Sequence, residues 1–334
     1  MLVSYDTIFM MNQLGYPPYR ITNRIVSLIT EISHHLGKIE GPSGIRIQPQ
    51  LRKSNRIKTI QGSLAIEGNT LDLKQVSAVL DGKRVIAPAR EILEVKNANR
   101  IYEQLTDFSV ASERDFLRAH KILMNDLIDT PGRYRKNNVG ILTGSKITHM
   151  APQAKLVSGL MKQLFSFIKK DRDTSPLIKA AVFHYETEFI HPFKDGNGRM
   201  GRLWQSVVLS TFNPLFQFIP QESLIKANQQ KYYRVLGQCD HAGESTAFIE
   251  FSLALLLKAV KEFASTIQVE PLTTLSRLET AAQHFGKMDF SRKDYLAFFK
   301  MISTATASRD LRAGVEKKAL VKRGDKASSR YKFT

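Results

Sequence analysis

Apolar residues recur at helical spacing along most of this chain, and that periodicity limits its fold more than any other feature. The stretch SPLIKAAVFHYETEFI, from Ser175 to Ile190, places apolar residues at i, i+3, i+4 and i+7, the pattern of a helix that buries one face. Strand patterns are rare by comparison. The same spacing predicts further helices over residues 23–41, 50–68, 112–128, 156–170, 201–212, 223–237 and 246–265. The sequence therefore predicts a mainly α protein.

Composition and charge indicate a globular protein with anionic partners. The 334 residues allow two or three domains, and a hydrophobic content of 43% suffices for a sizeable core. No apolar run approaches the roughly 20 residues of a membrane helix, and the start of the chain lacks the regions of a secretion signal. Cys239 is the only cysteine, so no intrachain disulfide can form, and we expect a cytoplasmic protein. The net charge of +18 favours nucleotides, nucleic acid or acidic protein surfaces as partners.

One segment is too polar and too rich in glycine to be core: HPFKDGNGRMGR, from His191 to Arg202. Pro192 ends the preceding helix, while Gly196 and Gly198 permit backbone conformations that other residues resist. Successive N–H groups in such a turn converge into an anion-binding nest. Because the next residues resume a helical pattern, the nest lies at a helix N-terminus, which also attracts phosphate.

The charged residues of this segment complete a site for a nucleotide. Arg199 and Arg202 lie three positions apart, so their guanidinium groups share one helical face and can clamp phosphoryl groups. Asp195 is a suitable Mg²⁺ ligand, because Mg²⁺ usually takes a carboxylate together with phosphate oxygens and water. His191 can accept a proton from an attacking hydroxyl at neutral pH. Together these groups predict transfer of a group from a nucleotide.

Two other interpretations of the segment stay open at this point. The run DGNGR also fits a glycine-rich loop beside a structural histidine. In addition, His184, Glu188 and His191 occur at i, i+4 and i+7, a spacing that can bind zinc. Pro192 ends that helix, however, and the sequence offers no obvious further ligand nearby.

The segment resembles the signature of the Fic family, H-x-F-x-[DE]-G-N-G-R-x-x-R, at every fixed position from His191 to Arg202. The resemblance extends from about Asn55 to Ser265 and includes GRYR at Gly132–Arg135. It implies a Fic-type helical bundle that transfers AMP from ATP to a Ser, Thr or Tyr hydroxyl of a protein and releases pyrophosphate. The related Doc-type kinases have a lysine where Gly198 stands, so Gly198 favours AMP transfer.

The resemblance also assigns roles to single residues. His191 is the catalytic base, Asp195 holds Mg²⁺, and Phe193 anchors the loop in the core. Nucleotide contacts fall to Gly196, Asn197, Gly198, Arg199, Arg202, Tyr232 and Tyr233, with Arg202 on the γ-phosphate and the two tyrosines on adenine or ribose. Aromatic residues in a helical pattern fit a core equally well, so the sequence leaves both interpretations of the tyrosines open.

A hairpin and a helix flank this site in the predicted fold. The runs VGIL and KITHM, on either side of Thr143–Ser145, predict a hairpin over about 138–152. It matches the family's flap, whose edge aligns the target segment by strand addition.

Upstream, SLAIEGN contains Ser63 and Glu67 and resembles the family's inhibitory motif, [ST]-x-x-x-E-[GN], on a helix over about 55–68. The resemblance implies that Glu67 pairs with Arg202 in the place of the γ-phosphate and misaligns ATP. The plain alternative is a surface glutamate at a helix end. Some family members also remove AMP from modified targets, and the sequence leaves that activity open.

The tail predicts a second function class. Helix SRKDYLAFFK, helix TATASRDLRAGVEKKALV and a hairpin around Gly324-Asp325 follow the order of a winged helix. From Gly286 onward the chain holds 13 Lys and Arg against 5 Asp and Glu. Arg309 and Arg312 share a face that fits a major groove, with Lys322, Arg323 and Lys326 near phosphates. A dimerisation or docking module with a basic surface is the alternative.

The predicted organisation is an N-terminal helical segment over 1–50, a Fic core over 51–267 and a winged-helix domain over 268–334. The predicted function is an adenylyltransferase restrained by Glu67, with ATP and Mg²⁺. The alternative is a DNA-binding transcription regulator whose core senses a nucleotide. Expected partners are a protein substrate, including the chain itself, DNA through the tail, and a second copy in a homodimer; no membrane partner is expected.

Overall fold

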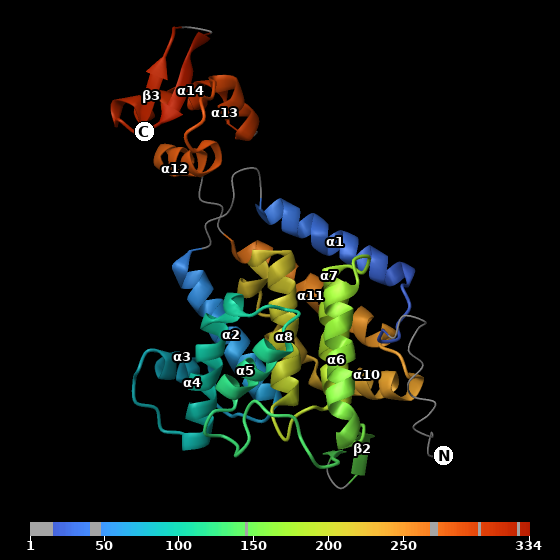
Figure 1. The fold of residues 1–334 in the computed structure, drawn as a ribbon. Coiled ribbons are helices and arrows are strands. Elements are labelled where there is room, and N and C mark those ends of the chain that lie inside the picture. The colour runs from blue at the N-terminus through green and yellow to red at the C-terminus, as the bar shows by residue number, and fades with distance from the viewer. Residues whose placement is uncertain (1–15, 41–47, 144–145, 268–272, 300–301, 326–327) are drawn as a thin grey trace. The chain divides into compact units, whose positions relative to one another are not determined.

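The computed structural model describes residues 16–40, 48–143, 146–267, 273–299, 302–325 and 328–334. Over these residues the chain is mainly helical, as predicted, with two short hairpins (Figure 1). It divides into two compact units, Met1–Ser33 with Gln48–Phe263 and His34–Ile47 with Ala264–Thr334. No helix within the described ranges is long and apolar enough to cross a membrane. The domain boundaries at residues 50 and 267 stay predictions.

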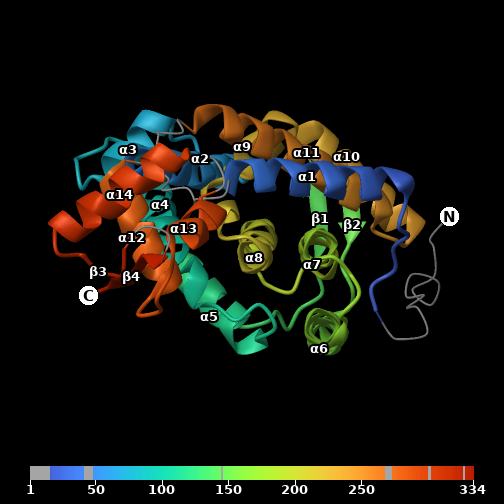
Figure 2. The same cartoon turned by 90° about the horizontal axis from the view of Figure 1, so that it is seen from above.

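Two buried helices, α7 (Pro176–Ile190) and α8 (Asn197–Phe212), form the centre of the first unit. They approach closely because Gly201 has no side chain: a Cβ there would lie 2.7 Å from Cδ2 of His184. The signature segment is the turn that joins them. Figure 2 shows both helices nearly end-on, with α5 (Glu113–Leu123) and α6 (Ala154–Lys170) on one side and α9 (Gln221–Ala227), α10 (Gln229–Ala242) and α11 (Thr246–Thr266) on the other.

The remaining helical elements of this unit are α1 (Asn23–Glu40, whose last residues belong to the second unit), α2 (Pro49–Ile66), α3 (Leu73–Leu80), α4 (Ala89–Glu103) and the 3₁₀ turns Leu105–Asp107 and Pro214–Phe218. The helices predicted from periodicity are present. Two differ. The stretch predicted as a single helix over 223–237 is α9 and α10, because Asn228 adopts a non-helical conformation and turns the chain. The helix predicted over 112–128 ends at Leu123, and Asp126 beyond it has a positive φ of 58°. Helix α5 begins after Ser112, whose side chain caps it by accepting a hydrogen bond from the Asp115 N–H.

An aromatic cluster fills the core beneath the signature segment. Phe116 packs edge-on to Phe165, Phe183 and Trp204, with ring centroids 5.1–5.6 Å apart. Phe193, from the signature segment, joins this cluster 5.4 Å from Phe116 and is fully buried. The loop is therefore anchored in the core by an apolar side chain, as the family resemblance implies.

Helix α2 is seated against α9 by a glycine. A Cβ on Gly62 would lie 2.7 Å from the backbone nitrogen of Ser223, so only glycine allows this approach. Ser63 faces the buried side, and Glu67 caps the C-terminus of the helix. Helix packing therefore sets where the predicted inhibitory residues lie.

A hairpin is present where the flap is predicted. Strands β1 (Gly140–Thr143) and β2 (Lys146–Met150) pair antiparallel, with Gly140 opposite Met150 and a bulge between Ile141 and Leu142. Of the predicted turn Thr143–Ser145, residues 144 and 145 lie outside the described residues.

The second unit contains α12 (Thr274–Phe285), α13 (Arg292–Phe298), α14 (Thr304–Glu316) and a hairpin of β3 (Leu320–Arg323) and β4 (Arg330–Phe333). One prediction is corrected here. Helix α14 stops at Glu316 rather than near Val321, because Lys318 has a positive φ of 57°, which an α-helix does not contain. The element order agrees with a winged helix, but membership of that class stays a prediction.

Candidate active site

His191 sits at the C-terminal end of α7 in a left-handed conformation, with φ 49° and ψ 58°. Its Nδ1 lies 3.4 Å from the carbonyl oxygen of Glu188. A carbonyl only accepts hydrogen bonds, so this contact places the ring proton on Nδ1 and the lone pair on Nε2. The side chain is partly exposed. Its tautomer and exposure suit a base that acts through Nε2.

The turn after His191 is closed by Asn197 rather than left open to solvent. The Asn197 carboxamide accepts from the Phe193 N–H at 2.8 Å and donates to the Phe193 carbonyl at 3.0 Å. Gly196 has a φ of +86°, and a Cβ there would lie 2.7 Å from the sulfur of Met124. Helix α8 then begins at Asn197, so the N–H groups of its first turn lack acceptors within the helix.

A buried histidine outside the signature, His120, supports this turn from below. Its Nδ1 accepts from the Gly132 N–H at 2.8 Å, so its Nε2 donates to the Asp195 carbonyl, 3.0 Å away. The ring stacks on Phe193 with centroids 3.6 Å apart. Burial lowers the pKa of His120 to about 4, so the ring stays neutral near pH 7 and keeps this pattern.

Arg135 joins the signature segment to both flanks of the β1–β2 hairpin. Its buried guanidinium donates to the carbonyls of Asn137 and Pro152, which bracket the hairpin, at 2.8 and 2.6 Å. It also donates to the carbonyls of Ile190 and His191, at 3.2 and 2.7 Å. One side chain therefore ties the backbone of the candidate base to the hairpin base.

Asp195 and Arg199 lie in a network of charges with α4. Asp195 accepts from the Gly196 N–H at 2.6 Å and from Arg199 at 3.1 Å, and Arg90 lies 3.4 Å from its other oxygen. Arg199 is almost fully buried and also contacts Glu94 at 3.4 Å. Since 41% of the Asp195 side chain is exposed, its carboxylate is accessible from solvent.

The residues present fit a Mg²⁺ ion only if the ion binds together with a nucleotide. Within the described part of the chain no group of three or more His, Cys, Asp or Glu is placed to hold a metal ion. Mg²⁺ bound with a nucleotide needs only one or two protein carboxylates, because phosphates and water supply the rest. Asp195 is the carboxylate that meets this requirement.

Arg202 is fully buried and faces α2. Its Nη2 lies 2.6 Å from Oε1 of Glu67, its Nε donates to the Ser63 hydroxyl at 3.1 Å, and Nη2 also reaches the Ser63 carbonyl at 3.1 Å. Glu67 keeps 31% of its side chain exposed. The residues singled out 135 positions apart in the sequence are thus in direct contact.

The Glu67 carboxylate occupies the space above the glycine-rich turn. A Cβ on Gly198 would lie 2.5 Å from Oε1 of Glu67 and 3.0 Å from Nη1 of Arg202. That Nη1 is buried without a hydrogen-bond partner, as is Nε of Arg199. Two guanidinium groups therefore present unsatisfied donors beside the turn, which an anion would satisfy.

Glu188 is a second carboxylate beside Arg202. Its Oε1 lies 4.0 Å from Nη1 of Arg202 and accepts from the Tyr232 hydroxyl at 2.7 Å. Burial would raise the pKa of Glu188, but hydrogen bonding and charge from His184, with the charge of Arg202, lower it to about 2. Glu188 is therefore ionised and lies beside Nη1 of Arg202, whereas Glu67 contacts Nη2.

The zinc interpretation of His184, Glu188 and His191 is wrong. His184 is buried, and its ring nitrogens lie 2.5 Å from the Gln205 carboxamide oxygen and 3.0 Å from the Tyr232 hydroxyl. Both nitrogens are thus engaged by other side chains. Helical spacing puts the three residues on one stretch of helix, but their side chains do not surround a common metal position.

The two neighbouring tyrosines lie in different surroundings. Tyr232 is 1% exposed and packs among His184, Phe248 and Phe251, so its ring belongs to the core. Tyr233 is 50% exposed. In this structure a nucleotide contact by an aromatic ring is available to Tyr233, while Tyr232 acts through the hydroxyl that holds Glu188.

The sequence patterns did not indicate His120 or Glu94, and they indicated Glu188 only as a candidate zinc ligand. GRYR carried a signal for Arg135 only as part of the resemblance. Side chains that bind backbone carbonyls, as His120 and Arg135 do, leave no spacing pattern in a sequence, because any residue supplies the carbonyl.

Comparisons with known proteins agree with this geometry. The model of the Fic/DOC family matches residues 110–209. A solved Fic family protein from Desulfovibrio desulfuricans G20 is 41% identical with a TM-score of 0.72, over 95% of this chain and 98% of that one. Fic-1 from C. elegans, 21% identical with a TM-score of 0.56 over 72% of this chain and 71% of that one, shares the fold.

Curated relatives include the protein adenylyltransferase Fic of Nematostella vectensis, 26% identical over 69% of this chain and 54% of that protein. The protein of the same name from Drosophila melanogaster is 27% identical over 75% of this chain and 52% of its own length. The chain thus spans about half the length of the curated relatives it matches. On the family match and the 41% identity across nearly its whole length, the chain belongs to the Fic family.

Proposed function

We propose that this chain is a protein adenylyltransferase that moves AMP from ATP to a hydroxyl of a protein and is restrained by Glu67. The observation that carries the proposal is the junction of α7 and α8. Within this one turn, His191 presents Nε2, the first turn of α8 presents N–H groups, and Arg202 presents an unsatisfied donor. The names of the curated relatives point to the same activity.

The proposed reaction needs only one base to account for the proton of the acceptor hydroxyl. The acceptor hydroxyl oxygen attacks the α-phosphorus of ATP as His191 Nε2 takes its proton. The bond from the α-phosphorus to the bridging oxygen breaks, and pyrophosphate leaves with that oxygen. The first-turn N–H groups of α8, Arg199 and Arg202 counter the charge on the phosphates. Mg²⁺ on Asp195 would supply further charge neutralisation when bound.

The restraint arises because Glu67 and the γ-phosphate compete for the guanidinium group of Arg202. Glu67 occupies Nη2 of Arg202 and lies against Gly198, where the phosphates must approach. A γ-phosphate cannot take this position while the carboxylate holds it, because two anions would then share the space. Removal of the carboxylate frees both the donor and the space.

The test compares labelling from ATP in the full chain and in Glu67→Gly, with Mg²⁺ and cell lysate. ATP labelled at the α-phosphate should label protein more strongly with Glu67→Gly, because Arg202 is released. ATP labelled at the γ-phosphate should give no labelling beyond that of the lysate alone, since in the proposed reaction that phosphate leaves in pyrophosphate. Mass spectrometry of the labelled protein should show AMP on a hydroxyl residue. Loss of AMP from a modified protein in the same assay would reveal the reverse activity.

Two controls separate the restraint by Glu67 from the catalytic reaction. Glu103→Ala removes a carboxylate paired with Arg56 of α2, away from Arg202, and should leave labelling at the wild-type level. His191→Ala combined with Glu67→Gly should abolish labelling. Equal labelling by wild type and Glu67→Gly contradicts the restraint, and labelling that survives His191→Ala contradicts the base assignment.

A second candidate function, DNA binding by the tail, is favoured by one observation. Arg309 and Arg312 of α14 are both exposed, three positions apart on one face. A gel shift with the full chain and duplex DNA tests it: binding should weaken steeply with salt and be lost in an Arg309→Ala, Arg312→Ala variant. Binding by that variant equal to wild type would remove these residues from any DNA contact.

A further inference from the structure

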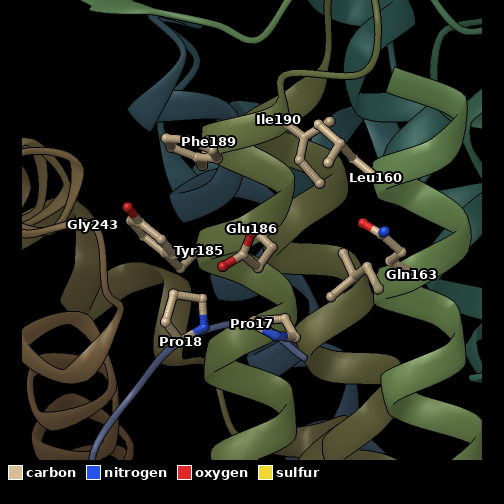
Figure 3. Close-up of a pocket in the computed structure, with 10 residues that line it drawn as sticks. Pro17, Pro18, Leu160, Gln163, Tyr185, Glu186, Phe189, Ile190 and Gly243 are labelled. Atoms are coloured by element: carbon tan, nitrogen blue, oxygen red, sulfur yellow. The ribbon is translucent and has the colours of Figure 1, made fainter. Parts of the chain in front are cut away.

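A cavity of about 30 Å³ lies in the first unit between α6 and α7, away from the signature turn. Its walls are apolar side chains, contributed by Pro17, Pro18, Leu160, Leu164, Phe189 and Ile190. Figure 3 shows Glu186 of α7 projecting into the middle of this group, with Gln163 of α6 at its side. The cavity is thus an apolar space with one carboxyl group pointing into it.

Glu186 is the unusual member of this cavity. It is only 6% exposed, and no described residue donates a hydrogen bond to its carboxyl group or forms an ion pair with it. The charged group that faces it is Asp240 of α10, which has the same sign and accepts from the Tyr185 hydroxyl at 3.0 Å. Burial, with the charge of Asp240, raises the pKa of Glu186 to about 8. Ionisation of an acid in apolar surroundings is costly unless a cation or hydrogen-bond donor replaces its hydration.

The residues around the Glu186 carboxylate determine which kind of ligand can pair with it. A carboxylate between apolar walls favours a cation that carries hydrogen-bond donors and has an apolar part. A metal ion is disfavoured: Ca²⁺ and Mg²⁺ need six or more oxygens, whereas the described walls offer Glu186 and the Gln163 carboxamide. The described residues also hold no cluster of three metal-ligating side chains.

The size of the cavity narrows the class further. A water molecule needs roughly 10–15 Å³ of such space, so this cavity admits about two water-sized groups. That is enough for an ammonium group and the carbon next to it, with the rest of an alkyl chain passing out between the apolar walls. We propose that this cavity is a binding site for a primary alkylammonium group, held by an ion pair with Glu186.

Binding of an alkylammonium group at this site should be accompanied by loss of the Glu186 proton. Glu186 must be ionised to form the pair, and neither Asp240 nor Tyr185 supplies a positive charge that would ionise it beforehand. A primary amine keeps its proton until about pH 10.4. Binding should therefore strengthen between pH 7 and pH 9, as Glu186 loses its own proton without help from the ligand.

The experiment measures the melting temperature of the full chain with increasing n-butylammonium chloride, against equal concentrations of sodium chloride. The melting temperature should rise with n-butylammonium and rise more at pH 9 than at pH 7, because the ligand binds only the folded chain. Glu186→Gln keeps the shape but removes the charge, and its apparent dissociation constant should be at least about tenfold larger. Glu262→Gln, at an exposed carboxyl outside the cavity, is the matched control and should respond as the wild type does.

A second variant guards against loss of folding in Glu186→Gln. Leu160→Phe fills the cavity from a partly exposed wall position and leaves the carboxyl in place, so it too should abolish the response. No response in the wild type at pH 9, or an equal response in Glu186→Gln, overturns the proposal. Nα-acetyl-lysine amide distinguishes two sources: a response to it assigns the ligand to a lysine side chain of a protein, and a response to n-butylammonium alone assigns it to a free amine.

Discussion

Two buried side chains outside the signature segment hold the candidate base in place. His120 binds the Asp195 carbonyl and stacks on Phe193, while Arg135 binds the carbonyls of Ile190 and His191. Their role follows from geometry: a base works only if its lone pair meets the reacting proton, and misplacement by about 1 Å can cost a hundredfold in rate.

Arg135→Lys should lower AMP transfer without unfolding the chain. A lysine keeps the charge, but one ammonium cannot reproduce the planar fork that reaches four carbonyls. In the Glu67→Gly background we expect kcat to fall at least about tenfold with little change in KM for ATP, because the base and flap shift while the phosphate site remains.

The exposed neighbour Arg133 supplies the matched control for that experiment. Arg133→Lys makes the same change of side chain and should leave kcat unaltered. A rise in KM for ATP with constant kcat in Arg135→Lys would instead place Arg135 in nucleotide binding.

Helix α2 is the element that carries the proposed restraint, and its position depends on packing rather than on Ser63 and Glu67. Ser63 and Glu67 reach Arg202 only because Gly62 lets α2 approach α9. Lys226 of α9 and Gln229 of α10 bind the last carbonyls of the helix, Ala65 and Ile66, at 2.7 and 2.8 Å. A shift of α2 away from α9 would therefore move Glu67 off Arg202.

Gly62→Ala tests this coupling. The added Cβ meets backbone atoms of Ser223 that cannot turn aside, so the free energy of unfolding should fall by about 1–3 kcal/mol. Labelling from α-labelled ATP should rise above wild type, because the displaced helix loosens the Glu67–Arg202 pair.

Gly159→Ala makes the same substitution in an exposed part of α6 with nothing near the added methyl group. It should stabilise the chain by up to about 1 kcal/mol and leave labelling unchanged. If Gly62→Ala lowers stability with labelling still at the wild-type level, the position of α2 does not control the restraint.

For the whole molecule, two buried acids shape how stability depends on pH. Burial, with the charge of Asp240, raises the pKa of Glu186 to about 8. Burial also raises the pKa of Glu222 to about 7, although its hydrogen bonds and Arg202 act in the opposite direction. Between about pH 4.3 and its raised pKa, each group keeps its proton in the folded chain, whereas a glutamate of the unfolded chain has already lost its proton in this range. The folded chain then binds more protons than the unfolded chain, so the free energy of unfolding falls as pH rises.

Urea unfolding between pH 5 and pH 8 measures this loss. Each such group lowers the free energy of unfolding by about 1.4 kcal/mol per pH unit up to its folded pKa. A Glu186→Gln, Glu222→Gln variant should lose most of that slope. A slope equal to that of the wild type would show that neither acid is protonated in the folded chain.

Sequence alone predicted the helical fold and the chemistry of the signature turn for a common reason. Helical periodicity and the run from His191 to Arg202 are local, so neighbouring residues carry both patterns. The Fic resemblance added a contact that no local pattern contains, between Glu67 and Arg202, and the structure has that contact. Its inhibitory role and the remaining site roles stay predictions.

Tertiary structure alone decided which side chains support the site. Tyr232 and Tyr233 are adjacent in the sequence, yet one is core and the other half exposed, because the faces of α10 meet different neighbours. His120 and Arg135 bind backbone carbonyls brought near by packing, and Glu186 lies beside a cavity that exists only once α6 and α7 meet. The physical reason is that burial and hydrogen-bond partners depend on residues far apart in the chain, whereas sequence patterns report only on near neighbours.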